Sequence, residues 1–439
     1  MKPQGLEDLP QRVDLSGSDC FHLVLDAHAR RNQAGGNVMR IALFFDDSLA
    51  LDQVSALLAR SPVALWLSNI RLCQGLFWSR PYWRYENKEK SVVVLEQEGK
   101  EYPVVPEAVL ARGISLTAER FLEADLIRYP GGQSALILSW NHILMDGRGI
   151  AMFLQHLQEL HAGLAARPIS SFFPGPEIRH SLRSQIRNMY MVKAFIEDSS
   201  KPPVASIAGG SAQIRAGSAN RILWFSREET GLIAENARLQ GARFGPNLFY
   251  IASCAQAVKQ LVQKREGKGD FWLPVPYDGR LRGAFGPLVS NTVAYLFYRL
   301  SEEQLLDTGS TVRAIFTQMH NQIRADMPRK YARLLDLMRH IPLRLYYYLV
   351  ARRAQGNLSS FLYSATGDSF SAADSFFGKR IAALTIFPSA TVPPGLTFSF
   401  LLHRDALNVN ISYARDIVDT FELDRLVQHL KKLLLEQQA

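Results

Sequence analysis

The sequence predicts an α/β protein, of the mixed α+β kind, that folds as two lobes. Both halves of the chain alternate short apolar runs with segments whose apolar residues recur at helical spacing. A stretch rich in proline and glycine, at about 165–219, separates the halves. The 439 residues, 47% hydrophobic and 21% charged, suffice for two domains with buried cores. We expect an N-terminal lobe at 1–170, a linker at 171–219 and a C-terminal lobe at 220–439.

The expected elements follow from apolar periodicity and from the turn residues between them. In the N-terminal half they are strands at 38–45, 92–95 and 134–140 and helices such as 51–59. The linker has structure of its own, because a basic amphipathic helix at about 180–196 interrupts it. The C-terminal half is expected to contain a strand at 221–225, helices at 228–239 and 246–264, a strand at 273–280, two helices, final strands and a helix at 421–435.

The most informative segment follows the strand at 134–140. His142 and Asp146 stand between this strand and a helix that begins near Gly149. A strand-to-helix connection is a common position for reactive groups. An imidazole titrates near neutrality and suits proton removal from an alcohol or amine, although a histidine at a strand end is often a plain hydrogen-bonding residue. The helix is indicated by Ile150, Phe153, Leu154, Leu157 and Leu160, which recur at helical spacing.

The segment 140–149, WNHILMDGRG, resembles the HHxxxDG signature of the condensation-domain superfamily of acyltransferases. That superfamily includes peptide-synthetase condensation domains, plant-type alcohol acyltransferases, polyketide-associated acyltransferases and bacterial wax ester synthases. The second histidine of the signature falls on His142, the aspartate on Asp146 and the glycine on Gly147, whereas Asn141 replaces the first histidine. A pattern this short also arises by chance, so its surroundings have to support it.

Other segments resemble the same superfamily and occur in the right order along most of the chain. The plant-type DFGWG motif is absent, which disfavours that branch. The resemblance implies the two-lobed chloramphenicol-acetyltransferase-like fold, with the active site in a tunnel between the lobes. The matching segments are DLSGSD at 14–19, the apolar run 37–44, the strand 273–280 that ends in Arg280, the G-x-x-x-x-N stretch 286–291 that ends in Asn291, and the terminal hairpin at 395–413.

The resemblance implies roles for the charged residues of the signature. His142 would act as general base in direct acyl transfer from a thioester, without an acyl-enzyme. Asp146 would pair with an arginine and fix the loop; we expect Arg280 as its partner, with Arg148 and Arg282 as rivals. The position of Asp146 also allows a simpler role, because aspartate is a favoured N-cap and a helix follows it.

The sequence also offers residues for contact with the substrate or with the developing oxyanion. Oxyanion donors are expected at Asn291 or Ser389, and Asn141 is a further candidate for substrate contact. Asn291 has the alternative of capping a strand end. Gly147 lacks a Cβ, which lets the backbone bend tightly or approach the substrate closely.

Composition and missing motifs narrow the function further. The N-terminal segment lacks the apolar core of a signal peptide, and no apolar stretch of about eighteen residues occurs. Cys20, Cys73 and Cys254 are unclustered and no HExxH occurs, so we expect no disulfide, no metal and no bound cofactor. A GxSxG elbow, a Walker loop and a strand-linked GxGxxG are also absent. We expect a cytoplasmic monomer.

The net charge of +9 fits partners that carry phosphates or carboxylates. Such partners are acyl-CoA, an acidic acyl carrier protein supplied in trans, or an anionic inner membrane face that the protein contacts peripherally. The clearest basic segment, 329–353, includes Arg329, Arg339 and Arg344 among tyrosines and leucines, as in an interfacial helix. The alternative is a solvated helix with one face packed on its lobe. No nucleic-acid module is recognisable, so we expect no nucleic-acid partner.

Three functions fit these observations. The first is transfer of an acyl group from a CoA or acyl-carrier-protein thioester to an alcohol, such as a lipid or a secondary metabolite. The second is condensation-type amide formation on an amine acceptor. The third is a non-catalytic relative that binds a carrier protein or membrane. The set of His142, Asp146, Gly147 and Arg280 favours catalysis, because a binding protein has no need of the base.

Overall fold

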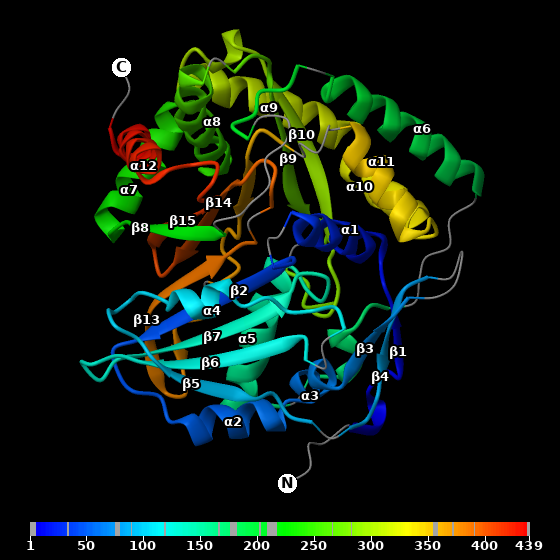
Figure 1. Ribbon diagram of the computed structural model, residues 1–439, viewed down its shortest axis with the longest axis vertical. Helices are drawn as coiled ribbons and strands as arrows, with labels where there is room; N and C mark the ends of the chain where they lie inside the picture. Colours follow the sequence, from blue (N-terminus) through cyan, green and yellow to red (C-terminus); the bar gives the residue numbers. More distant parts are fainter. Residues whose placement is uncertain are drawn as a thin grey trace.

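The computed structural model (Figure 1) has two lobes, one around a six-stranded sheet and one around a four-stranded sheet with a separate two-stranded sheet, and helices cover the sheets. The fold is therefore mixed α/β, as the sequence predicts. The structure describes residues 6–32, 35–74, 80–88, 90–117, 120–165, 167–175, 182–201, 203–208, 217–265, 267–281, 283–353, 359–370, 373–389 and 391–436.

The sheet of the N-terminal lobe has the strand order β12-β13-β2-β7-β6-β5. Its neighbours pair antiparallel except β5 and β6, which are parallel. Every residue of β2 and β7 is buried, which explains why these strands are almost wholly apolar rather than alternating. The strands are β2 (Val38–Phe45), β5 (Val94–Glu98), β6 (Leu122–Arg128), β7 (Ser134–Asn141), β12 (Ser375–Phe376) and β13 (Lys379–Phe387).

Helices and a small three-stranded sheet complete this lobe. Helix α5 directs Ile150, Phe153 and Leu157 into the core of the lobe, as its apolar spacing predicts. The helices are α1 (Gly17–Arg31), α2 (Leu51–Arg60), α3 (Pro62–Ser68), α4 (Glu107–Ala111) and α5 (Gly147–His161), with 3-10 turns at Leu6–Asp8 and Ile169–Phe172. The small sheet consists of β1 (Arg12–Asp14), β3 (Ile70–Cys73) and β4 (Tyr82–Tyr85).

The C-terminal lobe contains a sheet of order β11-β14-β15-β8 and the antiparallel pair β9 and β10. A second core, which includes Phe249, Phe361 and Phe398, lies beneath its helices. The strands are β8 (Ser218–Trp224), β9 (Phe271–Asp278), β10 (Val293–Leu300), β11 (Leu362–Ala365), β14 (Leu396–His403) and β15 (Ala406–Ala414). The helices are α6 (Leu182–Ser199), α7 (Arg227–Leu239), α8 (Asn247–Lys264), α9 (Thr308–Arg324), α10 (Met327–Met338), α11 (Leu343–Arg353) and α12 (Thr420–Leu435), with a 3-10 turn at Glu303–Leu305.

Three features differ from the sequence expectation. Strand β10 is not predicted, because its buried and partly buried residues alternate only in part. Three helices, α9 to α11, occur where two are expected, since the chain breaks its helical course around Pro342. Strand β13, from the C-terminal half, pairs with β2 in the N-terminal sheet. The expected lobe boundaries at 170 and 219 therefore leave β12 and β13 on the wrong side of the division.

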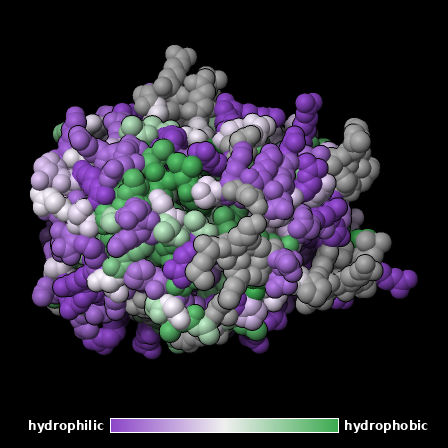
Figure 2. All heavy atoms as spheres, turned by 90° about the horizontal axis from the view of Figure 1, so that it is seen from below, coloured by the Kyte–Doolittle hydropathy of each residue, from purple (hydrophilic) through white to green (hydrophobic). Residues whose placement is uncertain are grey.

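Figure 2 shows the molecule from below. Hydrophilic residues make up most of the visible face, and apolar residues gather mainly left of its centre. Within the described ranges, no helix is both long enough and apolar enough to cross a bilayer.

Candidate active site

His142 lies directly after β7 and before α5. Its backbone N–H donates to the carbonyl oxygen of Asn37 (2.8 Å), which extends the pairing of β2 and β7 past the end of the strand. The side chain is partly buried, and its Nδ1 lies 3.1 Å from Oδ1 of Asn291. The sheet thus fixes the backbone of His142, and a residue from the C-terminal half fixes its ring.

The orientation of the Asn291 amide follows from its remaining contacts. Its Nδ2 donates to Oδ1 of Asp19 (2.9 Å) and to the carbonyl oxygens of His142 (2.8 Å) and Ile143 (3.2 Å). Because acceptors surround Nδ2, Oδ1 faces the imidazole and accepts the proton of Nδ1. The neutral His142 therefore carries its proton on Nδ1, and the lone pair of Nε2 remains for another partner.

Electrostatics keep this ring neutral at physiological pH. Burial lowers the pKa of His142 below its usual value of 6.5, and a backbone hydrogen bond, Asp146 and Asn291 offset part of this shift. A neutral imidazole with one nitrogen held and the other available has the geometry that a general base requires.

Asp146 has both of the structural roles that the sequence allows as alternatives. Its Oδ1 accepts from the N–H of Gly149 (2.8 Å), so it is the N-cap of α5. Its Oδ2 accepts from Nη1 of Arg280 (2.9 Å) and from the N–H of Thr292 (2.9 Å). The side chains of Asp146 and Arg280 are 5% and 3% exposed, so this is a buried ion pair. Burial disfavours the guanidinium charge, but Asp146 and Asp278 outweigh it and raise the pKa of Arg280.

The other hydrogen bonds of Arg280 agree with this pairing, and so does the contact that Arg148 makes instead. Nη2 of Arg280 donates to the carbonyl oxygen of Ser290 (3.3 Å), so the guanidinium also holds the segment that precedes Asn291. Arg148 instead directs Nη1 toward the hydroxyl of Ser369 at 3.5 Å. Arg282 lies outside the described residues.

The two glycines at the start of α5 differ in how much space surrounds them. Gly147 has no positive φ, and a Cβ on it would lie 3.6 Å from a methyl carbon of Thr366, an ordinary contact distance. On Gly149 a Cβ would lie 2.7 Å from the carbonyl oxygen of Leu288. The close backbone approach at the start of α5 is thus at Gly149, where the helix meets the segment that contains Leu288; a close approach of substrate to Gly147 stays a prediction.

The residues expected to contact the oxyanion or substrate are engaged within the protein. Asn141 is buried, and its Nδ2 donates to Oδ1 of Asp26 (3.1 Å). Both protons of the Asn291 amide face protein acceptors, as described above. The hydroxyl of Ser389 donates to Oδ1 of Asn37 (2.7 Å). The contacts of Asn141, Asn291 and Ser389 therefore support the site structurally, and a role of Asn291 or Ser389 at the oxyanion stays a prediction.

A second imidazole beside His142 was not anticipated from the sequence. The ring of His22 in α1 stacks on that of His142, with centroids 3.9 Å apart and planes 18° from parallel. Its Nδ1 lies 3.3 Å from Nδ2 of Asn37. Burial, and then the neighbouring His142, lower the pKa of His22 well below 6.5, so the ring is neutral at pH 7. Nε2 of His22 has no hydrogen-bond partner among the described residues.

Two buried carboxylates in α1 support the residues that hold the imidazoles. Asp19 accepts from the backbone N–H groups of Asn291 (2.7 Å) and Ser16 (2.8 Å). Burial raises the pKa of Asp19, and these bonds offset part of the shift. Asp26 accepts from the N–H of Asn37 (2.8 Å). Ser16 and Asp19 also form the capping box of α1, a local arrangement that gives no sign of the contact with Asn291.

The basic segment 329–353 is less uniform than its sequence suggests. Arg329 and Arg344 are exposed on α10 and α11. Arg339 is 8% exposed and approaches Asp336 (3.7 Å), and Tyr346 is buried in the core. Among the described side chains of the segment, the exposed basic face is thus smaller than expected; the side chains of Arg352 and Arg353 lie outside the described residues. Among the described residues, no group of three or more histidine, cysteine or acidic side chains is placed to hold a metal ion.

Solved structures share this fold over nearly the whole chain. The first condensation domain of the CDA synthetase is similar over 98% of this chain and 97% of its own, with a TM-score of 0.67 and 17% identity. For TRI3 trichothecene 15-O-acetyltransferase from Fusarium sporotrichioides the shares are 98% and 96%, the TM-score 0.65 and the identity 13%. Polyketide synthase associated protein 5 from Mycobacterium tuberculosis is similar over 98% of this chain and 100% of its own, with a TM-score of 0.59 and 14% identity.

The chain therefore has the condensation-domain, chloramphenicol-acetyltransferase-like fold that the sequence resemblance implies. No protein-family model matches the sequence, and no curated protein matches it.

Proposed function

We propose that the protein is an acyltransferase that moves an acyl group from a CoA or acyl-carrier-protein thioester to an alcohol, such as a lipid or a secondary metabolite. The observation that carries the proposal is the state of His142: neutral, with Nδ1 held by Asn291 and the lone pair of Nε2 available. The fold supports the same reaction class, because one structure of this fold is named as an O-acetyltransferase and another contains C8-CoA.

The reaction that this arrangement serves is direct transfer. Nε2 of His142 takes the proton of the acceptor hydroxyl while the oxygen forms a bond to the thioester carbonyl carbon. The C–S bond then breaks, the sulfur leaves as thiolate, and the imidazolium returns the proton to it, so that an ester and a thiol result. A thiolate is a good leaving group, so base catalysis and the alignment of the two substrates supply what the step needs.

The residues around His142 have positioning roles in this scheme. Asn291 holds Nδ1 and so directs Nε2 toward the acceptor. Asp146 favours the imidazolium electrostatically and thereby stabilises the ring when it carries the transferred proton. Arg280 donates to the Asp146 carboxylate and holds it in place.

An amine acceptor is the second candidate, because the same fold occurs in condensation domains of peptide synthetases. The chemistry at His142 is the same, with an amine nitrogen in place of the hydroxyl oxygen. A non-catalytic binding protein is the third candidate, and the oriented, neutral His142 argues against it.

The test is His142→Ala, with products from a panel of acyl-CoA donors and alcohol or amine acceptors identified by mass spectrometry. Loss of the base should lower turnover by about 10²- to 10⁴-fold without unfolding the protein. His161→Ala, an exposed histidine at the end of α5, is the matched control and should keep wild-type turnover. Wild-type rates in a folded His142→Ala protein would refute the catalytic assignment.

A further inference from the structure

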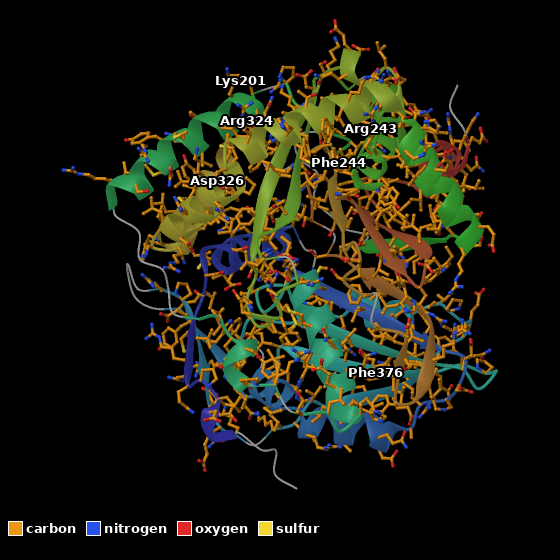
Figure 3. The ribbon with its side chains drawn as sticks, turned by 180° about the vertical axis from the view of Figure 1, so that it is seen from behind. Lys201, Arg243, Phe244, Arg324, Asp326 and Phe376 are labelled. Atoms are coloured by element: carbon orange, nitrogen blue, oxygen red, sulfur yellow. The ribbon has the colours of Figure 1, made fainter. Side chains whose placement is uncertain are left out.

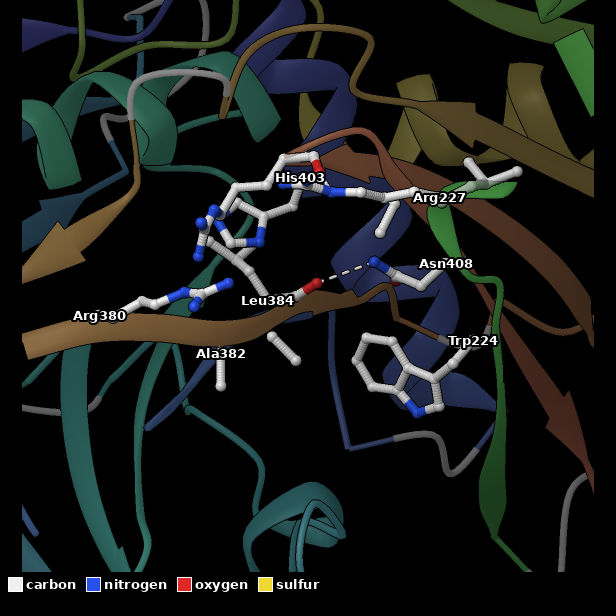
Figure 4. Close-up of a pocket in the computed structure, with 11 residues that line it drawn as sticks. Trp224, Arg227, Arg380, Ala382, Leu384, His403 and Asn408 are labelled. Carbon is white, nitrogen blue, oxygen red and sulfur yellow. Dashed lines mark hydrogen bonds between the residues drawn. The ribbon is translucent and has the colours of Figure 1, made fainter. Parts of the chain in front are cut away.

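A cavity lies on the seam between the lobes, away from the signature segment. Its volume is 160 Å³, and its lining comes from the end of β8, the start of α7, the first half of β13 and the β14–β15 hairpin. Asn408 closes one side by donating to the carbonyl oxygen of Leu384 (2.8 Å), which ties β15 to β13 (Figure 4). The cavity is therefore built on strands of both sheets rather than on loops.

The charge of the cavity is positive. Arg227, Arg380 and Arg404 line it, and no lining residue is acidic. Figure 4 shows Arg380 and Arg227 reaching in from opposite sides. Arg404 approaches Asp374 at 3.6 Å, outside the lining, and Arg380 has no carboxylate partner among the described residues. Arg227 and Arg380 therefore present guanidinium groups to the cavity without a carboxylate in its lining, and such groups bind phosphate oxygens.

The hairpin that presents these groups is held in an unusual backbone conformation. Arg404 and Asp405 both have positive φ, 51° and 63°, in a two-residue turn for which Asn-Gly is the common choice. Non-glycine residues pay a conformational cost there, and such strain is frequent at ligand-holding sites. Nε of Arg227 donates to the carbonyl oxygen of Arg404 (3.1 Å), so the turn also fixes the second arginine.

An aromatic side chain supplies a different kind of surface in the same cavity. The indole of Trp224 is 38% exposed, although tryptophan is a largely buried residue type. Its ring meets Phe44 edge-on, with centroids 6.3 Å apart and planes at 83°. Exposed aromatic faces beside arginines bind heterocyclic bases by stacking while the guanidinium groups bind phosphate.

The distance to His142 can be read from the strand register. Leu384 in the cavity pairs with Leu43, and Asn141 pairs with Val38 on the same strand β2. Five residue steps along β2 separate the two levels, about 17 Å at the usual strand rise. Because β13 and β7 flank β2 on opposite sides, two strand spacings add about 10 Å across the sheet, and the straight distance is about 20 Å. An extended pantetheine arm spans a comparable distance between its thiol and its phosphate.

We propose that this cavity binds the phosphorylated nucleotide end of a CoA-type thioester donor, with Trp224 against the adenine base and Arg227 and Arg380 on the phosphates. The inference rests on the proposed acyl transfer at His142 and assigns the donor side of that reaction. The volume accommodates part of a nucleotide, and the remainder lies along the exposed arginines at the rim.

The first experiment measures binding without turnover. Adenosine 3′,5′-bisphosphate is titrated calorimetrically into the wild-type protein and into the Arg227→Gln/Arg380→Gln variant; both arginines are exposed, so the fold is not at risk. We expect at least tenfold weaker binding in the variant. Arg243→Gln is the control, because this exposed arginine, labelled in Figure 3, lies beyond the far end of α7, about 20 Å away. Equal affinity in all three proteins would overturn the proposal.

Further measurements distinguish a nucleotide from other ligands that carry phosphate. Trp224→Ala should weaken the binding of adenosine 3′,5′-bisphosphate at least threefold and leave the affinity for inorganic pyrophosphate unchanged. Equal losses of affinity for both ligands would overturn the proposed stacking of Trp224 on the base. In kinetics, the double arginine variant should raise KM for acyl-CoA and leave KM for an acyl-N-acetylcysteamine donor unchanged. An equal rise in KM for acyl-CoA and for an acyl carrier protein would show that the arginines do not recognise a nucleotide.

The same measurements distinguish failure of the inference from failure of the proposed function. Nucleotide binding that depends on the arginines, together with turnover that survives His142→Ala, would refute the function and keep the cavity assignment. Turnover that depends on His142 but not on Arg227 or Arg380 would refute the cavity assignment and keep the function.

Discussion

The buried pair of Asp146 and Arg280 allows a quantitative test of how the site is held together. Its Oδ2–Nη1 distance is 2.9 Å and both side chains are at most 5% exposed. Removing one partner of such a pair leaves an uncompensated buried charge, at a cost of about 3–5 kcal/mol. We choose Asp146→Asn, because asparagine is also a good N-cap and preserves the bond to Gly149. Arg280→Met removes the charge and keeps most of the volume.

The expected shift follows from the length of the chain. An unfolding entropy of about 2.1 cal/mol/K per residue gives about 0.9 kcal/mol per kelvin for 439 residues that unfold together. A loss of 3–5 kcal/mol then lowers Tm by about 3–5 °C in each single variant. The double variant buries no unpaired charge and should lose less than the sum of the two. Differential scanning calorimetry measures all four proteins, and additivity within about 0.5 kcal/mol would refute a direct interaction.

Three further predictions concern other residues. His22→Ala should lower kcat at least tenfold by freeing the ring of His142, and His22→Phe, which keeps a stacking ring, should recover most of it; equal losses would refute the positioning role. Burial lowers the pKa of His156 to about 4, so below pH 6.5 the unfolded chain binds a proton that the folded protein does not, and stability should fall by about 3 kcal/mol between pH 6.5 and 4. Denaturant titrations of His156→Gln should show a shallower loss over this range, and an unchanged slope would contradict the assignment. Arg329→Glu/Arg344→Glu should raise KM for an acceptor on anionic vesicles, in a salt-dependent way, and leave a soluble acceptor unaffected; identical kinetics on vesicles would mark these residues as ordinary surface.

Local patterns in the sequence were enough to predict the elements that carry the signature. The apolar run before His142 and the helical spacing after Gly149 predict β7 and α5 with ends that differ by one or two residues from those observed. Both signals come from neighbouring residues, because β7 is buried on both faces and α5 on one. The same reasoning misses β13 in the N-terminal sheet, since nothing in its own sequence specifies pairing with β2.

Long-range contacts set the limit of sequence reasoning at the site. Residues Asp146 and Arg280 are 134 positions apart, and charge alone left three arginines as partners; the superfamily resemblance selected one. The contact of Asp19 with Asn291 spans 272 positions. The spacing that places Asp19 in a capping box describes its own helix, so it cannot specify an acceptor for a distant amide. No sequence pattern marks His22 as a site residue, because its role arises from stacking on a residue of another element.

The short segment 290–292 of the C-terminal half makes several of the contacts that position the signature segment. Ser290 forms a parallel bridge with Met145, Asn291 holds the His142 ring, and the N–H of Thr292 donates to Asp146. A shift of this segment would turn Nε2 of His142 away, and proton transfer requires hydrogen-bond geometry. The orientation of the His142 ring therefore depends on how the two lobes pack against one another. A signature segment with the right residues but without these distant contacts would not fix the orientation of its imidazole. Replacing Arg280 should therefore lower both the stability of the protein and the turnover that depends on His142.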